Sequence, residues 1–169
     1  MALPSKLKYF STFVNGHDFI GETTEVALPK LARKLEDFRA GGMDGPIGID
    51  MGQEKLEMEV TYGGLIREVL NQYAATKHDD LLLRFAGAYQ REDGGDYEAV
   101  EVVVRGRIQE IDPGSAKAGD DTTFKTKLHL SYYKLTINGA TVIEIDQVGM
   151  VCVVNGQDRL AAARKAIGR

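Results

Sequence analysis

Strict alternation of polar and apolar residues is the pattern that most constrains how this chain folds. Five stretches alternate in this way, and residues 55–62 do so most clearly. There the apolar set is Leu56, Met58, Val60 and Tyr62, and the polar set is Lys55, Glu57, Glu59 and Thr61. Because successive side chains of a strand point to opposite faces, this segment is predicted to be a half-buried strand. A chain built from such strands without a reactive pocket usually works through its surface, which favours binding or self-assembly.

Further strands are predicted before and after this segment. They cover residues 10–14, 19–28, 81–89, 98–111, 124–137 and 140–145, and the turns between them include Asn15-Gly16 and Asn138-Gly139. Asn-Gly favours a two-residue hairpin because both positions tolerate positive φ. In residues 124–137 the apolar phase changes by one residue after Tyr132. Such a change moves the buried side chains to the opposite face, so we expect a bulge or a sharp bend near Tyr132.

Three segments depart from this pattern. Residues 31–51 surround a glycine-rich tip, Gly41-Gly42-Met43-Asp44-Gly45-Pro46, that can continue neither a helix nor a strand, and we interpret them as a protruding hairpin arm. Helical spacing of Leu65, Val69, Leu70 and Tyr73 predicts a helix over residues 65–75 with one apolar side. An alanine-rich helix is expected at residues 158–167.

Composition narrows the class of protein. A length of 169 residues fits one domain, residues 1–169, and allows a substantial core. A net charge of −4 is unsuited to gripping nucleic acid by neutralising phosphates, although it would let nucleic acid pass without sticking. The single cysteine, Cys152, lies in an apolar run and is expected to be buried. The N-terminus does not resemble a signal peptide and no stretch suits a membrane anchor, so synthesis in a cytoplasm is expected.

No cluster of residues predicts chemistry. The histidines, His17, His78 and His129, are isolated in sequence, and His78-Asp79-Asp80 fits a solvated turn better than a metal site. Glu92-Asp93-Gly94-Gly95-Asp96 lacks the spacing of a calcium loop. The glycines of the 41–45 segment lack the spacing of a nucleotide-binding loop. We therefore expect no catalytic, cofactor or metal site, and we expect that the chain is not an enzyme.

Most of the predicted long strands have one polar face, and a single copy gives this face no role beyond contact with water. An open sheet leaves edges that need protection, and subunits in a ring can close such a sheet jointly. A polar face would then line a channel. The candidates for lumen-facing residues are Lys55, Glu57, Glu59, Glu101, Arg105, Lys125, Lys127 and His129. Which of these polar faces points inward is left open by the sequence.

Specific runs of residues resemble the major tail tube protein family of contractile-tailed bacteriophages, which includes the tube proteins of R-type pyocins. The resemblance covers essentially the whole chain. It lies in Leu28-Pro29-Lys30-Leu31, in residues 34–46 with Arg39-Ala40-Gly41-Gly42-Met43-Asp44, in Ile49-Asp50-Met51-Gly52, in Asp112-Pro113-Gly114, in Ser131-Tyr132-Tyr133-Lys134-Leu135, in Glu144-Ile145-Asp146 and in Asn155-Gly156. It implies a mainly β fold, shared with type VI secretion tubes: two packed antiparallel sheets, as a β-sandwich or half-barrel, with a flanking α-helix and an extended hairpin arm.

The resemblance also implies a function. Hexameric rings would stack helically into the inner tube of a contractile tail, each subunit giving four strands to a joint barrel, and DNA would pass through the lumen. The implied partners are the tail sheath outside, the baseplate and terminator proteins at the ends, and the tape measure protein and then DNA inside, in a virion. Contact between rings is expected from the arm, through Arg39, Gly41, Gly42, Met43, Asp44 and Pro46. The alternatives are the tube of a phage-derived bacteriocin or injection device, or a monomeric β-barrel that binds a small ligand.

Overall fold

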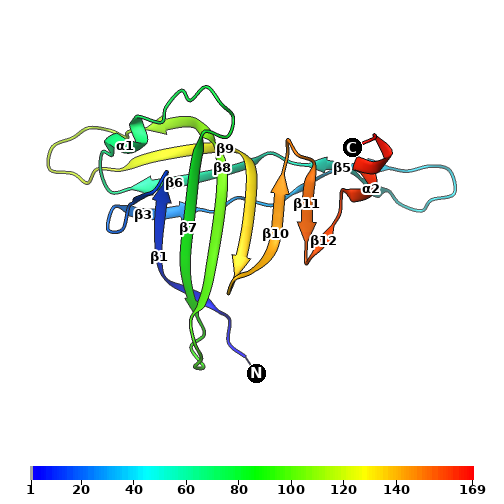
Figure 1. Cartoon of the computed structure of the whole chain (residues 1–169), viewed down its shortest axis with the longest axis horizontal. Helices are drawn as coiled ribbons and strands as arrows, with labels where there is room; N and C mark the ends of the chain where they lie inside the picture. Colours follow the sequence, from blue (N-terminus) through cyan, green and yellow to red (C-terminus); the bar gives the residue numbers. More distant parts are fainter. Residues whose placement is uncertain (1) are drawn as a thin grey trace.

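The structure is a computed structural model that describes residues 2–169, and its regular secondary structure is mainly antiparallel β-strand (Figure 1). The strands are β1 (Lys6–Val14), β2 (His17–Asp18), β3 (Thr23–Ala27), β4 (Arg33–Phe38), β5 (Ile47–Gln53), β6 (Leu56–Tyr62), β7 (Leu81–Gln90), β8 (Glu98–Asp112), β9 (Phe124–Ile137), β10 (Ala140–Asp146), β11 (Val151–Val154) and β12 (Gln157–Asp158). The helices are α1 (Arg67–Leu70) and α2 (Ala161–Ala166).

The strands form two layers that share β8 and β9. The wide layer has the order β12-β11-β10-β9-β8-β7-β1-β2, and the second layer continues from β9 to β6 and β3. We call the second layer the four-stranded sheet; it consists of β3, β6, residues 124–130 of β9 and residues 106–112 of β8. Strands of the two layers run crosswise, because β8 and β9 turn from one layer into the other (Figure 1). This arrangement confirms the prediction of two packed antiparallel sheets, and it adds that the sheets are hydrogen-bonded to each other.

The turn in β9 falls at the predicted place. Arg105 pairs with Tyr132 and Gly106 pairs with Leu130, so Ser131 has no partner residue on β8. An extra residue on one strand of an antiparallel pair is a β-bulge, which bends the strand and increases its twist. The change of apolar phase at Tyr132 is therefore the sequence signature of the point at which β9 leaves one layer for the other.

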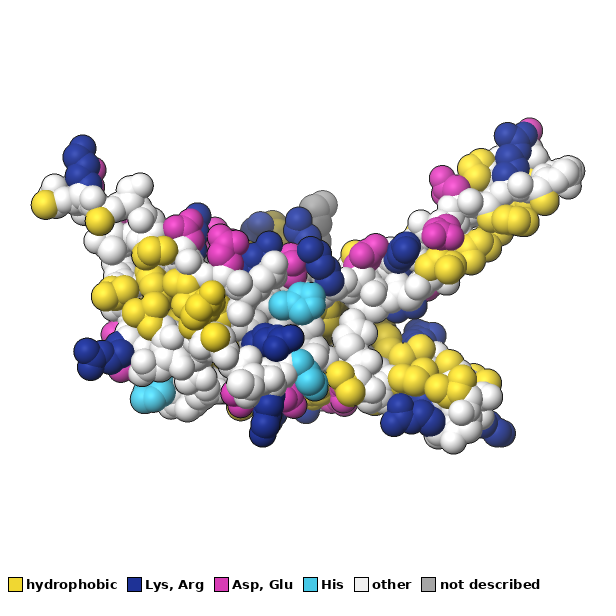
Figure 2. Space-filling view, turned by 90° about the horizontal axis from the view of Figure 1, so that it is seen from above, with side chains coloured by type: hydrophobic (Ala, Val, Ile, Leu, Met, Phe, Trp, Pro, Cys, Tyr) yellow, Lys and Arg dark blue, Asp and Glu magenta, His cyan; other side chains and the backbone are white. Residues whose placement is uncertain are grey.

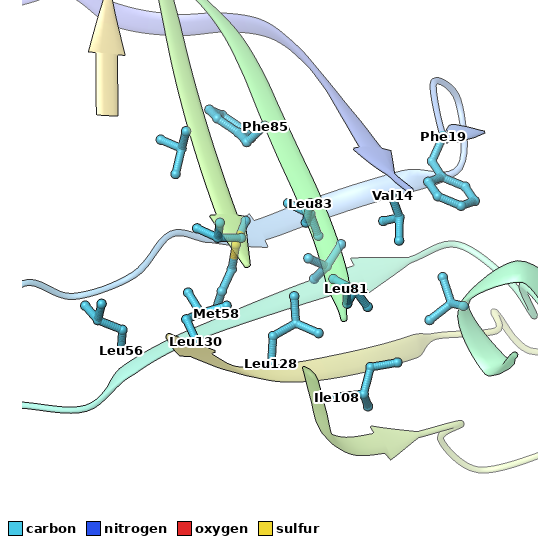
Figure 3. Close-up of a cluster of buried hydrophobic side chains, with 14 of the residues drawn as sticks. Val14, Phe19, Leu56, Met58, Leu81, Leu83, Phe85, Ile108, Leu128 and Leu130 are labelled. Atoms are coloured by element: carbon cyan, nitrogen blue, oxygen red, sulfur yellow. The ribbon is translucent and has the colours of Figure 1, made fainter. Parts of the chain in front are cut away.

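The core fills the space between the two layers. Leu81, Leu83 and Phe85 of β7 lie above Leu56 and Met58 of β6 (Figure 3). Leu128 and Leu130 of β9 and Val102 and Val104 of β8 complete it, and each of these side chains is at most 3% exposed. These are the apolar members of the alternating segments, so the period-two pattern located the core faces correctly.

The arm is a separate two-stranded hairpin, β4–β5, that projects from one end of the molecule (Figure 1). Phe38 pairs with Ile47 next to the tip, and Arg33 pairs with Gln53 at the base. The interpretation of residues 31–51 as a hairpin is thus confirmed in its secondary structure, with the second strand ending at Gln53. Arm residues 31–42 and 44–51 are exposed, so the hairpin gains little from packing on its own chain.

The helices are shorter than the sequence predicts. Only Arg67–Leu70 is helical within the predicted 65–75 segment. Beyond it Gln72 and Tyr73 donate to the carbonyls of Val69 and Leu70, three residues back, and Ala74 has φ +62°, which ends the helix. Asp158, predicted to begin the last helix, instead forms β12 with Gln157 on β11, and α2 starts at Ala161. None of the helices in residues 2–169 is long and apolar enough to cross a membrane.

Candidate assembly surfaces

One face of the arm is an exposed apolar stripe. Directly paired residues of antiparallel strands share a face, so Phe38 with Ile47 and Glu36 with Ile49 lie on the same side. Phe38, Ile47, Ile49 and Met51 are 51%, 52%, 41% and 53% exposed. Figure 2 shows hydrophobic side chains following one side of this projection. We call these four residues the arm stripe. The stripe was not among the contact residues predicted from the sequence, which lie at the tip, although the alternation of Ile47, Ile49 and Met51 indicates it.

The tip of the arm is held by contacts within itself. Arg39 donates from Nε to the carbonyl of Met43 at 3.2 Å, and the Met43 amide donates to the carbonyl of Ala40 at 3.2 Å. Gly42 has φ +87°, in the region that favours glycine, whereas Gly41 does not. A Cβ on either glycine would meet nothing within 4 Å. Of the predicted contact residues, Arg39, Gly41, Gly42, Asp44 and Pro46 are exposed and Met43 is half-buried, so all six gather at a free tip.

The base of the arm is fixed by a bidentate ion pair. Arg33 donates to both carboxylate oxygens of Asp50, with Nε 3.0 Å from Oδ2 and Nη2 3.0 Å from Oδ1. The Gly52 amide also donates to Asp50 Oδ1, at 2.9 Å. These donors, Arg33 first, lower the pKa of the Asp50 carboxyl from its usual 3.8. Because a guanidinium fork matches a carboxylate in a single plane, the pair holds the two strands of the arm in one register.

The outer face of the four-stranded sheet carries mixed charge. Glu59 lies opposite Lys127 on the neighbouring strand, and Lys127 lies opposite Glu110 on the next. One row further along, Thr61, Lys125 and Asp112 are aligned in the same way. Opposite charges placed across strands stabilise the pairing, whereas like charges would weaken it. Each lysine therefore has a carboxylate beside it, and the face has no uninterrupted basic stripe.

Glu57 is the most connected charge on this face. Its carboxylate lies 3.0 Å from Lys55 Nζ and 3.6 Å from Lys127 Nζ. The ion pair with Lys55 and the nearby charge of Lys127 lower the pKa of the Glu57 carboxyl below its usual 4.5. His129 lies opposite Glu57 on β9. The structure thus brings six of the eight predicted lumen residues onto one surface: Lys55, Glu57, Glu59, Lys125, Lys127 and His129.

The other two predicted lumen residues lie elsewhere. Arg105 is the last residue of β8 before the bend and pairs with Tyr132. Glu101 lies in the wide layer, where its carboxylate accepts from Arg84 Nε of β7 at 2.9 Å. The sequence could not distinguish Glu101 and Arg105 from the other six predicted lumen residues. Polar and apolar residues of β8 continue to alternate in the same phase where the strand passes from one layer into the other. Only the pairing partners reveal the change of layer.

Within residues 2–169 of a single copy, both edges of the four-stranded sheet lack a partner strand. β3 pairs only with β6, and β8 loses its partner β7 at Gly106, the residue paired with Leu81. Every neighbouring pair in this sheet is antiparallel, so β3 and β8 run in opposite directions. If a second copy is placed edge to edge with the first, β3 of the second copy therefore runs antiparallel to β8 of the first. Unpaired strand edges of this kind are templates for pairing with another chain.

No group of His, Cys, Asp and Glu within residues 2–169 has the geometry of a metal site. His78 contacts Ser131 Oγ at 3.1 Å, and His17 and His129 are exposed. A shallow concavity at the end of the four-stranded sheet has a mostly apolar lining, formed by Leu65, Leu70, Tyr73, Gln109, Glu110, Ile111, Pro113 and Phe124. We call it the α1 groove; Leu65 and Tyr73 within it are 72% and 60% exposed. The predicted helix at 65–75 pointed to an apolar side formed by these side chains, and the structure leaves Leu65 and Tyr73 exposed.

Comparison with solved structures places the fold among components of contractile machines. The chain resembles a chain of the sheath/tube terminator of an extracellular contractile injection system, with a TM-score of 0.60 at 10% identity over 79% of this chain and 96% of that one. A chain of the sheath–tube complex of such a system gives a TM-score of 0.59 at 10% identity, over 79% and 91%. At this identity the comparison shows a shared fold.

Sequence comparison shows the family. The model of the phage tail tube protein FII family matches residues 4–168. The chain is 46% identical over 171 residues to the tail tube protein of Escherichia phage P2, covering 99% of both proteins. It is 38% identical over 169 residues to the major tail tube protein of Serratia phage KSP20, covering 96% of this chain and 97% of that protein. The chain belongs to the phage tail tube protein family, whose members are structural proteins of the phage tail.

Proposed function

We propose that copies of this chain join edge to edge into hexameric rings, whose joined four-stranded sheets form the wall of a hollow tube. The observation that carries the proposal is the pair of free, oppositely directed edges, β3 and the 106–112 part of β8, on the two sides of one sheet. Closing a sheet on itself removes its edges. The junction between β8 of one copy and β3 of the next would be antiparallel, like every pair within the sheet.

The mixed-charge face of this sheet lines the lumen in the proposed tube. The opposite face packs on the core, with Leu56, Met58 and Leu128 each at most 1% exposed, so it is not available to a channel. DNA is retained by surfaces that neutralise its phosphates with unpaired lysine and arginine. Lys125 and Lys127 instead lie beside Asp112, Glu59 and Glu110. A wall of this composition would let the genome slide during ejection without binding a particular sequence.

The arm supplies the contact between stacked rings in this proposal. Its tip residues, Arg39, Gly41, Gly42, Met43, Asp44 and Pro46, project beyond the end of the four-stranded sheet, and their side chains make few contacts with their own chain. Head-to-tail contacts between rings do not close on themselves, so stacking continues into a tube. Many weak contacts repeated in each ring would give a stable assembly through avidity.

The remaining partners follow from the place of such a tube in a contractile tail. The sheath would surround it, terminator and baseplate proteins would bound its ends, and the tape measure protein would occupy the lumen before DNA. The solved sheath–tube complex that shares the fold supports the sheath as a neighbour. The same likeness favours a second candidate, the tube of a phage-derived injection device, which would use the same assembly without a genome. The proposed setting is the virion after synthesis in a host cytoplasm, with no enzymatic activity.

Negative-stain electron microscopy of the purified chain tests the proposal. We expect rings or hollow tubes of uniform diameter. They should form from the wild-type chain alone or after addition of baseplates, which act as nuclei for assembly. A chain that stays monomeric at high concentration with nuclei present would contradict assembly and would favour the monomeric ligand-binding module. Tubes isolated from particles, with and without packaged DNA, distinguish a phage tail from an injection device.

A further inference from the structure

Two apolar surfaces of this chain are left uncovered by the residues that the structure describes. The arm stripe, Phe38, Ile47, Ile49 and Met51, is a convex ridge on a thin hairpin. The α1 groove is concave and is bordered by Leu65, Leu70, Tyr73 and Pro113. Figure 2 shows one group of hydrophobic side chains on the arm and another at the opposite end of the molecule, in the position of α1 in Figure 1. Exposed apolar patches of this kind mark interaction sites on folded proteins.

The two surfaces lie at opposite ends of the same sheet. The arm leaves the four-stranded sheet after Ala27 and returns at Leu56, which pairs with Leu130. At the other end of these strands Tyr62 pairs with Phe124, and Phe124 lines the α1 groove. A ridge at one end and a groove at the other can join identical copies head to tail without either surface being used twice.

We propose that the arm stripe of one copy docks in the α1 groove of a copy in the adjacent ring. This inference rests on the proposed function and names the surface that receives the arm. Charges of opposite sign lie beside the two surfaces: the arm face carries Glu36, and Arg67 of α1 lies beside the groove, both exposed.

The amount of apolar surface fits a contact made only within an assembly. An aromatic side chain contributes roughly 150–250 Å² when fully buried, so Phe38 and Tyr73 at about half exposure offer on the order of 100 Å² each. Together with the aliphatic residues, the contact covers less than the roughly 800 Å² per partner that a stable pair needs. The arm should therefore fail to dimerise free copies and bind only when ring edges hold many arms in place.

Site-directed disulfide crosslinking between two differently marked populations tests this docking. In a Cys152→Ser background, one population carries Ile49→Cys and the other Leu65→Cys; both positions are exposed, so the fold should tolerate them. The populations are mixed, assembled and oxidised. A covalent dimer is expected that contains one chain of each kind. The matched control uses Tyr97→Cys in place of Leu65→Cys. Tyr97 is also exposed, but it lies just before the first residue of β8, whereas the α1 groove lies beside the last residues of β8.

Each outcome decides the inference. A mixed dimer formed by Ile49→Cys with Leu65→Cys, and lost with Tyr97→Cys, supports the docking. Tubes that form normally but give no such dimer, or give it equally with the control, overturn the docking and leave the tube itself standing. A wild-type chain that forms no rings or tubes even with nuclei overturns both proposals. A Leu65→Glu variant that melts like the wild type and still forms tubes of normal length would also contradict the docking.

Discussion

Gly106 of β8 and Leu130 of β9 approach so closely that a Cβ on Gly106 would lie 2.9 Å from the Leu130 Cα, and nearer still to the His129 carbonyl oxygen. This contact occurs at the bulge where both strands pass between layers. A residue without a side chain is required there because the obstructing atoms are backbone and cannot rotate away. The four-stranded sheet and the wide layer are joined where β8 and β9 pass from one to the other.

A Gly106→Ala variant should therefore be clearly less stable than the wild type. Inserting a carbon against backbone forces the strands apart, and overpacking of this kind costs about 1–3 kcal/mol or more. The free energy of unfolding, measured by urea denaturation, should fall by that amount. Gly41→Ala is the matched control, because its Cβ would meet nothing within 4 Å and its φ is not positive. Equal stability of the two variants would show that the bend does not need glycine.

Replacing both tip glycines, Gly41→Val with Gly42→Val, should stop tube growth while the isolated chain stays folded. Among the described residues, a Cβ on either glycine would meet nothing within 4 Å, so the melting temperature should change little, although the change at Gly42, where φ is +87°, strains the turn locally. Tube length in electron micrographs and thermal unfolding are the two measurements. Tubes of normal length from the double variant would remove the tip from the contact between rings.

The ion pair at the arm base should make the arm sensitive to acid. The pKa of Asp50 is lowered from 3.8 by Arg33 and the Gly52 amide, so this pair stabilises the folded arm above pH 3.8 and is lost as the pH falls through the lower, folded value. The Gly52 amide chemical shift should titrate with a midpoint below 3.8. Arg33→Gln should raise that midpoint, and Asp50→Asn should abolish the titration. A wild-type midpoint at or above 3.8 would contradict the pairing.

Reversing one charge on the mixed-charge face should slow passage of DNA without preventing assembly. Glu59→Lys removes the carboxylate opposite Lys127 and leaves like charges side by side in every copy of the tube. The resulting basic surface should bind phosphates in a salt-dependent manner. The rate of DNA release from particles carrying the variant is the measurement. Asp96→Lys, an equal change of charge in an exposed loop outside this sheet, should release DNA at the wild-type rate; equal slowing by both would remove the face from the lumen.

Local pattern in the sequence predicted most of the strands and turns. The Asn15-Gly16 and Asn138-Gly139 turns have positive φ at both positions, as the hairpin prediction requires. The change of phase at Tyr132 located the bulge, because burial of one face leaves its mark on every second residue. The helix at 65–75 was overestimated, since helical spacing alone did not reveal that Leu65 and Tyr73 remain outside the core.

The sequence by itself determined which residues of each strand face the core and where the chain turns, because a strand's period and a turn's φ angles depend on near neighbours. The tertiary structure decided which outward-facing side chains become neighbours and which surfaces stay uncovered. It brought Glu57 beside Lys127, placed Glu101 in the wide layer, and left the arm stripe and the α1 groove uncovered at opposite ends of the four-stranded sheet. Those outcomes depend on pairing between strands far apart in the chain, which no local pattern encodes.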